Sequence, residues 1–453
     1  MSYVIYYMLY RKATGFDTLS PETQEAHMYI EKIAESVRLC AVKTDKFKTC
    51  RINVTMAMPL DSGVTARALV PFMLQRRSAE YPDFTAFNRV KDELYGATVS
   101  AGVSRSGEAQ IINFGLTAID DRFALDDEKI GLKCVDLLMK LIFEPLTDGE
   151  SFPADVIEQE KRLHKEAIEN EMNDKRRYAM MKCEAEMFKN EAYSINCLGT
   201  VDEVDALTPD TVYAAWQDLL KKANTQITMV GSMDAEPVAQ ALRERFSAVE
   251  REPAEIKTEF VNSVSELKYI DESMAIKQGK LVIGFRTGMS DENDNAAAMR
   301  VAVDIFGGGP YSKLFSVVRE KMSLCYYCSA AFFKAKGVVM VQSGIEEVNE
   351  EKAKAAILDQ LSEVANGDFS DETFSFSVKA LSDAVLGNND TPETLAAWYS
   401  SQLLSDRLKT PEEYADEIRA VTRDGVIRAA ATVVPDTIFM LRSNGEVGDE
   451  NAD

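Results

Sequence analysis

Histidine, the side chain that most often binds metals in proteins, occurs only twice in this chain of 453 residues. The two are His27 and His164. A zinc site built on two imidazoles would need both of them. However, His27 lies in a stretch without helix or strand periodicity, and His164 lies in a highly charged helical segment, where a solvated side chain is the simpler interpretation. The sequence therefore predicts no metal site, and we expect no cofactor in this chain.

Two further groups of residues have spacings that suggest thiol or phosphate chemistry. Cys325 and Cys328 are three residues apart, but in a predicted strand such residues point to opposite faces of the sheet. The run Gly307–Pro310 lacks the Gly-Lys-Ser/Thr that a phosphate loop requires. No nucleophile elbow or dinucleotide-binding fingerprint occurs either. The sequence thus predicts neither a redox centre nor a nucleotide site.

The composition narrows the class of protein and of partner. Hydrophobic residues make up 46% of the chain and charged residues 28%, a balance typical of soluble globular proteins. The net charge of −23 argues against nucleic acid, which needs a clustered positive surface. Seven thinly spread cysteines are typical of a reducing compartment, and no apolar run reaches the roughly 18–20 residues of a membrane helix. We expect a cytoplasmic protein that binds neither nucleic acid nor membrane.

The elements that would position any site follow from periodicity and turn signals. Arg51–Leu60 alternates as a half-buried strand does, and Val99–Leu116 indicates two strands around a turn at Ser106–Gly107. The segment Met28–Val42 also resembles a strand. Thr208-Pro209-Asp210 is a helix-start signal. We predict helices over residues 66–74, 132–143, 154–188 and 207–220, and a buried strand over 226–230.

The same plan then repeats after a polar, aperiodic segment. We predict strands over residues 280–285, 324–332 and 338–345, and helices over 295–306 and 311–321. Strands mixed with helices in two similar halves indicate an α+β fold with a duplicated sheet-plus-helix domain. The predicted units are an extension (1–27, with Met28 a candidate for the natural start), a first domain (28–249), a linker (250–267), a second domain (268–442) and an acidic tail (443–453).

The helix over residues 66–74 resembles a degenerate form of one found in the insulinase, or pitrilysin-type, metallopeptidase family. That family consists of two such α+β halves arranged as a clamshell, and its catalytic helix carries His-x-x-Glu-His. The two histidine positions correspond here to Ala68 and Phe72, and the glutamate position to Pro71. The family's third ligand, a glutamate on a later helix, corresponds to Ala167, one residue after Glu166. The resemblance implies that the zinc ligands are lost.

A second segment resembles the part of the family that contacts substrate. Residues 311–328 (YSKLFSVVREKMSLCYYC) are similar to the family's pattern Ser-Arg-Leu-Phe-x-x-(Leu/Val)-Arg-Glu-Lys-x-Gly-Leu-Ala-Tyr. In active members this Arg and Tyr hold the substrate backbone and help to stabilise the transition state. They correspond to Arg319 and Tyr326. Guanidinium and phenol groups are suitable donors to a peptide carbonyl or a developing oxyanion. From residue type alone, the favoured interpretation is structural: Arg319 would cap the C-terminus of a helix, and Tyr326 would fill a face of the sheet.

Loss of the zinc motif together with this Arg/Tyr pair is similar to the zinc-less subunit of heterodimeric bacterial members. Four further runs resemble that branch, some of whose members have names that refer to elongation factor P modification: residues 46–49, 93–97, 174–179 and 341–345. The resemblance implies a non-catalytic subunit that binds a peptide or small protein and pairs with a zinc-bearing homologue. The alternative is a scaffold or binding protein with the same fold and no proteolytic role. A free-standing zinc peptidase is disfavoured because the histidines are missing.

Overall fold

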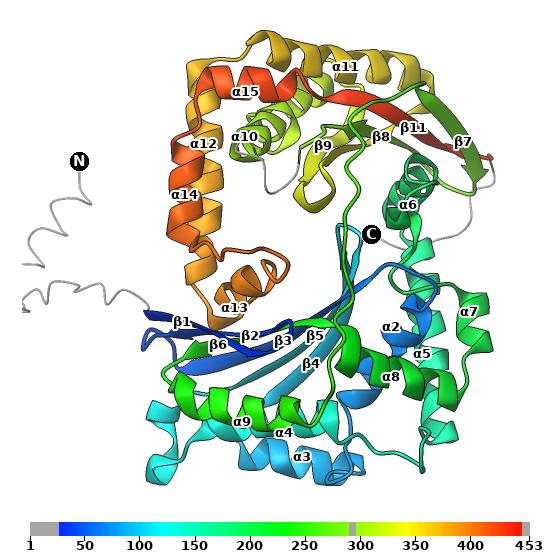
Figure 1. The fold of residues 1–453 in the computed structure, drawn as a ribbon. Helices are drawn as coiled ribbons and strands as arrows, with labels where there is room; N and C mark the ends of the chain where they lie inside the picture. The colour runs from blue at the N-terminus through cyan, green and yellow to red at the C-terminus, as the bar shows by residue number, and fades with distance from the viewer. Residues whose placement is uncertain (1–26, 290–295, 446–453) are drawn as a thin grey trace, which may run out of the picture.

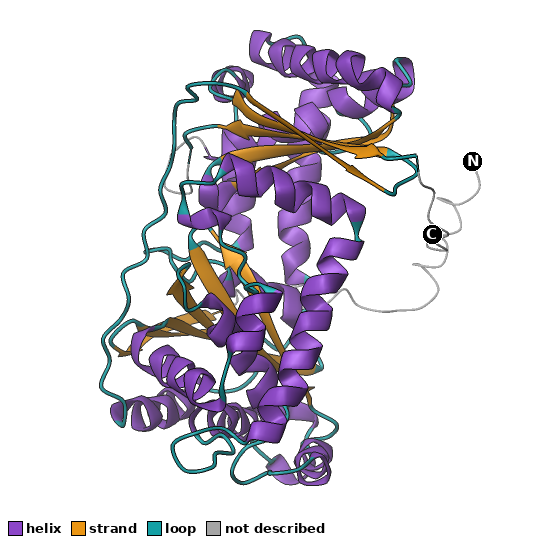
Figure 2. Cartoon of the chain, turned by 90° about the vertical axis from the view of Figure 1, so that its right-hand side faces the viewer, coloured by secondary structure: helices purple, strands orange, loops and turns teal. Residues whose placement is uncertain are grey.

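The computed structural model describes residues 27–289 and 296–445, which form two halves, each made of a sheet and helices. We call residues 27–249 the first half and residues 268–445 the second half (Figure 1). Residues 250–264 have no regular secondary structure and run as a long loop along one side of the molecule (Figure 2). The mixed α+β architecture with two sheet-plus-helix halves is confirmed.

The elements of the first half alternate between strands and helices. They are β1 (His27–Ala34), β2 (Val37–Lys43), β3 (Thr49–Pro59), α2 (Val64–Leu74), α3 (Phe84–Glu93), β4 (Thr98–Ser106), β5 (Ala109–Ile119), α4 (Ile130–Phe143), α5 (Ala154–Asn173), α6 (Lys175–Met187), α7 (Val201–Ala206), α8 (Pro209–Lys222), β6 (Asn224–Gly231) and α9 (Ala235–Ser247).

The second half follows with β7 (Lys268–Met274), β8 (Gly279–Arg286), α10 (Ala296–Gly307), η4 (Leu314–Lys321), β9 (Cys325–Phe333), β10 (Val338–Ile345), α11 (Glu350–Asn366), α12 (Asp371–Leu386), α13 (Pro392–Ser400), α14 (Pro411–Arg419), α15 (Arg423–Ala430) and β11 (Val434–Ser443). The segment η4 is a π-helix, in which the backbone N–H of Met322 donates to the carbonyl of Val317, five residues earlier.

The two sheets have the same topology. The first has the strand order β1-β2-β6-β3-β5-β4 and the second β7-β11-β8-β10-β9. In each, the first shared strand (β2 or β7) pairs in parallel with the last (β6 or β11), and all other neighbours are antiparallel. Apart from the additional edge strand β1, chain order and spatial order match strand for strand. This match agrees with the repeat predicted from the sequence.

Two predicted elements are each divided by a polar residue. The helix predicted over 154–188 is two helices, because the Asp174 side chain accepts hydrogen bonds from the N–H groups of Arg176 and Arg177 and starts α6 as an N-cap. The strand predicted over 28–42 is the hairpin β1–β2, which reverses where Ser36 adopts a positive φ of 51°. The pattern of hydrophobic residues continues across Asp174 and across Ser36, so it did not reveal either break.

One helix from each half packs against the sheet of the other half. Met180 of helix α6, and Phe188 just after the end of that helix, pack against Val282 and Phe439 of the second sheet. Helix α13 of the second half packs Tyr399 and its neighbours against the first sheet (Figure 1). Both sheets are therefore covered by helices on two faces, and the reciprocal packing joins the two halves.

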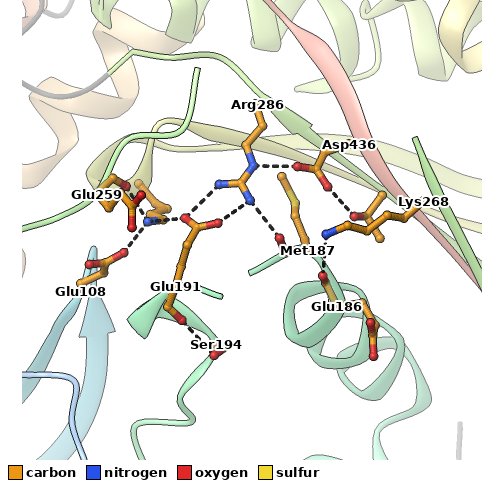
Figure 3. Close-up of polar contacts among 11 residues, drawn as sticks. Glu108, Glu186, Met187, Glu191, Ser194, Glu259, Lys268, Arg286 and Asp436 are labelled. Carbon is orange, nitrogen blue, oxygen red and sulfur yellow. Dashed lines mark hydrogen bonds and ion pairs between the residues drawn. The ribbon is translucent and has the colours of Figure 1, made fainter. Parts of the chain in front are cut away.

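A buried network of charges also links the halves (Figure 3). Arg286 on β8 forms a two-point pair with Glu191 of the first half, at 2.6 and 3.0 Å, and an ion pair with Asp436 at 2.9 Å. Lys336, in the turn between β9 and β10, is fully buried and pairs with Glu191 at 2.7 Å and with Glu108 in the turn between β4 and β5. Buried charges are stable only when paired in this way. The network fixes two hairpin tips against each other.

Parts of the predicted termini lie outside the described residues. These are the predicted extension apart from His27, and residues 446–453 of the predicted tail. Among the residues that the structure describes, no helix combines the length and the apolar character that spanning a bilayer requires.

Candidate functional site

Helix α2 contains the three positions at which the predicted zinc motif is lost. Ala68 is fully buried, Pro71 is buried and Phe72 is half-buried. A methyl group, a pyrrolidine ring and a phenyl ring supply no metal ligand and no proton acceptor. Pro71 also lacks the N–H that the helix interior normally uses. These residues pack the helix, and they do not fit a zinc ion.

Helix α5 lies against α2 and presents two polar side chains to it. The ring of His164 lies 6.1 Å from that of Phe72, measured between centroids. The expectation of a solvated His164 is wrong, because only 4% of the residue is exposed and its Nε2 lies 2.8 Å from the carbonyl oxygen of Leu198. Burial lowers the pKa of His164. The imidazole is thus held neutral as part of the packing between the two helices.

Glu160 lies one turn before His164 and is 2% exposed. Its carboxylate faces Arg76 at 3.5 Å, and burial raises its pKa. Ala167 continues the same stripe of α5, seven residues after Glu160, and is exposed, as is Glu166. Sequence reasoning missed that His164 faces Phe72 of the degenerate motif and that Glu160 faces Arg76 just after α2. Their i, i+4 spacing on the apolar stripe with Ile157 and Ile168 was the available signal.

The Arg/Tyr pair lies in the second half, on η4 and at the start of β9. Arg319 is 38% exposed, stacks over the ring of Phe315 at 4.4 Å and approaches Glu320 at 3.6 Å. Tyr326 is 61% exposed, and its hydroxyl donates to Glu346 at 3.2 Å. That hydrogen bond raises the pKa of Tyr326. Both side chains therefore present their donor groups at the surface of this chain.

The structure does not bring the two predicted groups of residues together. Within the described residues, the polar contacts of Arg319 and Tyr326 are with Glu320 and Glu346 of the same half. Helices α2 and α5 belong to the other half (Figure 1). In residues 27–289 and 296–445, no cluster of three or more His, Cys, Asp or Glu side chains could hold a metal ion.

The strand predicted over residues 324–332 contains a β-bulge at Tyr326. Ile345 of β10 pairs with Cys325, and the preceding residue, Gly344, pairs with Tyr327, so Tyr326 is left without a partner on β10. The extra residue shifts the alternation of side chains. The expectation that Cys325 and Cys328 point to opposite faces is therefore wrong: they share the face of the sheet that packs against the core of the second half.

Comparisons with known proteins show which family this chain belongs to. A family model described as "Peptidase M16 inactive domain" matches residues 206–381. A Bacillus subtilis protein named "Probable inactive metalloprotease YmfF" is 33% identical over 402 residues, which cover 88% of this chain and 94% of that protein. The chain belongs to the M16, or insulinase-type, peptidase family.

Solved structures support the fold of this M16 protein. A conserved protein from Enterococcus faecalis V583 has a TM-score of 0.83 and 26% identity, and the match covers 93% of this chain and all of that one. A peptidase M16 inactive domain from Pseudomonas fluorescens has a TM-score of 0.74 at 18% identity and shows the fold alone, with 92% of this chain and 98% of that chain covered. The two-half M16 architecture is therefore shared along nearly the whole chain.

Proposed function

We propose that this chain is the non-catalytic, substrate-binding subunit of a two-chain peptidase, whose partner is a zinc-bearing M16 homologue. The observation that carries the proposal is the combination of a packed, ligand-free α2 with an exposed Arg319/Tyr326 pair. The Arg319 side chain is partly exposed and Tyr326 is exposed, so both donors are within reach of a bound peptide. In this proposal the active site is shared between chains, and zinc belongs to the partner.

The chemistry proposed for this chain is recognition of a peptide backbone. The Arg319 guanidinium has several N–H donors in a planar fork, and it is already oriented by stacking on Phe315. The Tyr326 hydroxyl donates a hydrogen bond to Glu346, and it would donate to a substrate oxygen instead when a peptide is bound. Such donors act best on oxygen atoms where negative charge develops. Arg319 would bind a carbonyl of the peptide, and Tyr326 would stabilise the oxygen of the bond being cleaved.

The test is reconstitution with the zinc-bearing homologue from the same organism. We expect the lone chain to contain no stoichiometric zinc and to cleave no peptide, and the pair to be active. Arg319→Ala and Tyr326→Phe should each lower kcat/KM by about 10²–10³, as loss of one oxyanion donor does elsewhere, while assembly by size-exclusion chromatography is unchanged. Arg407→Ala, which removes an exposed arginine in the loop before α14, is the matched control. Full activity in both test variants would remove the proposed roles.

A scaffold role is the second candidate, and one observation favours it. The contacts of Arg319 with Phe315 and of Tyr326 with Glu346 already account for how these side chains are held within the chain. A scaffold would co-purify with partners that show no peptidase activity, and neither substitution would change that assembly. A partner that brings both zinc and activity would exclude this second candidate.

A further inference from the structure

Two positively charged side chains, one from each half, meet over a single aromatic ring of the second sheet. Arg176, the second residue of α6, has its guanidinium carbon 4.4 Å from the ring centroid of Tyr327. Lys280, on β8, has its ammonium nitrogen 6.0 Å from the same centroid. Tyr327 directly follows Tyr326 on β9, which is an edge strand of this sheet. The two cations therefore lie beside the Arg/Tyr segment.

The register of the second sheet places the aromatic ring between the cations. Lys280, Gly344 and Tyr327 lie in one row across β8, β10 and β9. A Cβ on Gly344 would lie 2.5 Å from the ring of Tyr327, so the ring lies over this glycine and needs it to remain small. Cys328, the next residue of β9, faces the core together with Val318 of η4. Tyr327 and both cations thus lie on the opposite face of β9 from η4.

Neither cation has a carboxylate partner in the part of the chain that the structure describes. Arg176 donates from Nε to the side-chain oxygen of Gln342 at 2.6 Å and approaches the hydroxyl of Ser329 at 3.5 Å. Lys280 donates to the side-chain oxygen of Gln278 at 2.9 Å. Burial, together with the charge of Arg176, lowers the pKa of Lys280. Neutral groups thus hold two cations close together, which costs free energy unless an anion joins them.

The nearest acidic group is already engaged. Among the described residues that act electrostatically on Lys280, Asp174 is the carboxylate. Its side chain is the N-cap of α6 and accepts hydrogen bonds from the N–H groups of Arg176 and Arg177. Two cations against one carboxylate leave a positive charge here, on a chain whose net charge is −23. Because Arg176 is exposed and Lys280 is half-buried, an anion from solvent can reach both.

We propose that Arg176 and Lys280 form a carboxylate-binding subsite, which takes an acidic side chain or the C-terminal carboxylate of a peptide bound at Tyr326. The terminal N–H groups of the Arg176 guanidinium and the Lys280 ammonium are the donors, and charge-assisted hydrogen bonds of this kind are strong. The ring of Tyr327 is the apolar floor between them. The subsite rests on the proposed function, since it requires that this chain binds peptides, and it adds a preference for one acidic group.

The test is peptide binding to the folded full-length chain alone, followed by fluorescence anisotropy. The probes carry an uncharged dye and share an uncharged sequence of alternating serine and leucine with blocked ends. In each probe one residue is replaced by glutamate, and one further probe has a free C-terminal carboxylate. We expect one glutamate position, or the free C-terminus, to bind about tenfold more tightly than the uncharged parent peptide. Which of the two gains affinity identifies the source of the carboxylate.

Variants assign that gain to the two cations. Arg176→Gln and Lys280→Gln should each remove most of the gain. Arg177→Gln is the matched control on the same helix, because Arg177 pairs with Glu171 at 3.2 Å, and it should keep the gain. No binding by any probe, no gain from any carboxylate, or a gain that persists in both test variants would overturn the subsite.

The same assay separates the subsite from the peptidase proposal. Binding of the uncharged peptide without a gain would overturn the subsite and leave the proposed function standing. A gain that depends on both cations, beside a reconstituted pair that cleaves no peptide, would support the subsite and contradict the two-chain peptidase. Neither measurement on the lone chain needs zinc or the partner.

Thermal unfolding gives a readout that a purely structural role would not produce. Because the fold disfavours the charge of Lys280, Lys280→Gln should leave the melting temperature unchanged or raise it. The favoured carboxylate peptide should raise the melting temperature of the parent more than that of the variant, since a ligand stabilises the state that binds it. A variant that melts several degrees lower without peptide would contradict the proposal, because the charge would then serve the fold.

Discussion

Replacing Lys336 with methionine tests whether the buried charge network joins the two halves. The Lys336 side chain is fully buried, and its ammonium contacts carboxylates of Glu108 and Glu191, both from the other half. Methionine keeps most of the volume and removes the charge. Glu191 would still be paired with Arg286, but Glu108 would lose the ion-pair partner that it has within the described residues. The main consequence is therefore one buried and uncompensated carboxylate.

The expected loss of stability in Lys336→Met follows from this single uncompensated carboxylate. Removing one member of a buried pair typically lowers the free energy of unfolding by about 3–5 kcal/mol. Because Glu191 keeps its two-point pair with Arg286, we expect the lower end of this range, about 3 kcal/mol. Glu108→Gln should be milder, about 1 kcal/mol, since the amide oxygen can still accept a hydrogen bond from Lys336. The double variant should recover at least about 1 kcal/mol relative to the sum of the single effects.

The assay is urea denaturation followed by circular dichroism, for the parent, both single variants and the double variant. Lys379→Met is the matched control, because Lys379 is 73% exposed and its pair with Asp383 is worth little. A change of less than about 1 kcal/mol in Lys336→Met, or strict additivity in the double variant, would refute the reasoning.

The same variants carry a pH signature. Burial alone would raise the pKa of Glu191, but hydrogen bonds from Arg286 and Lys336 outweigh it and hold that pKa below its usual value. A carboxyl whose folded pKa is depressed contributes stability above its unfolded pKa, near 4.3, and loses it as the pH falls through the folded value. The part of the stability difference between the parent and Lys336→Met that comes from Glu191 should therefore be full at pH 7 and shrink below about pH 4.

Two further perturbations test the contact between the halves after α13 and the packing of α5 against α2. Arg38 donates hydrogen bonds to the backbone carbonyls of Gln402, Leu403 and Ser405, just after α13. Arg38→Ala should therefore lower the free energy of unfolding by about 1.5–3 kcal/mol and speed amide hydrogen exchange after α13 more than elsewhere. Unchanged exchange in that segment would contradict this expectation. Burial lowers the pKa of His164, so a charged imidazole is disfavoured in the fold and stability should fall as the pH drops below the unfolded value of about 6.5. Compared with the parent, His164→Phe should lose less stability between pH 7 and 5, and identical pH profiles would show that His164 is not the group responsible.

The sequence by itself determined the absence of a two-histidine zinc motif and the α+β repeat. Both depend on local information: residue identity at i, i+3 and i+4 on a helix, and hydrophobic alternation along strands. Thr208, with Pro209 behind it, marked the start of α8 correctly because an N-cap is a contact between neighbours in sequence. Local signals also identified the Arg319/Tyr326 segment through its resemblance to the family.

Tertiary structure decided where those residues lie and what surrounds them. The burial of His164 depends on α2 packing against α5, and a charged helix pattern cannot show which stripe a distant helix will cover. The shared face of Cys325 and Cys328 depends on one unpaired residue in a strand, which is defined only when the partner strand β10 is in register. The buried pairs of Lys336 join hairpins more than two hundred residues apart. Such features arise from long-range packing, for which the sequence carries no periodic signal.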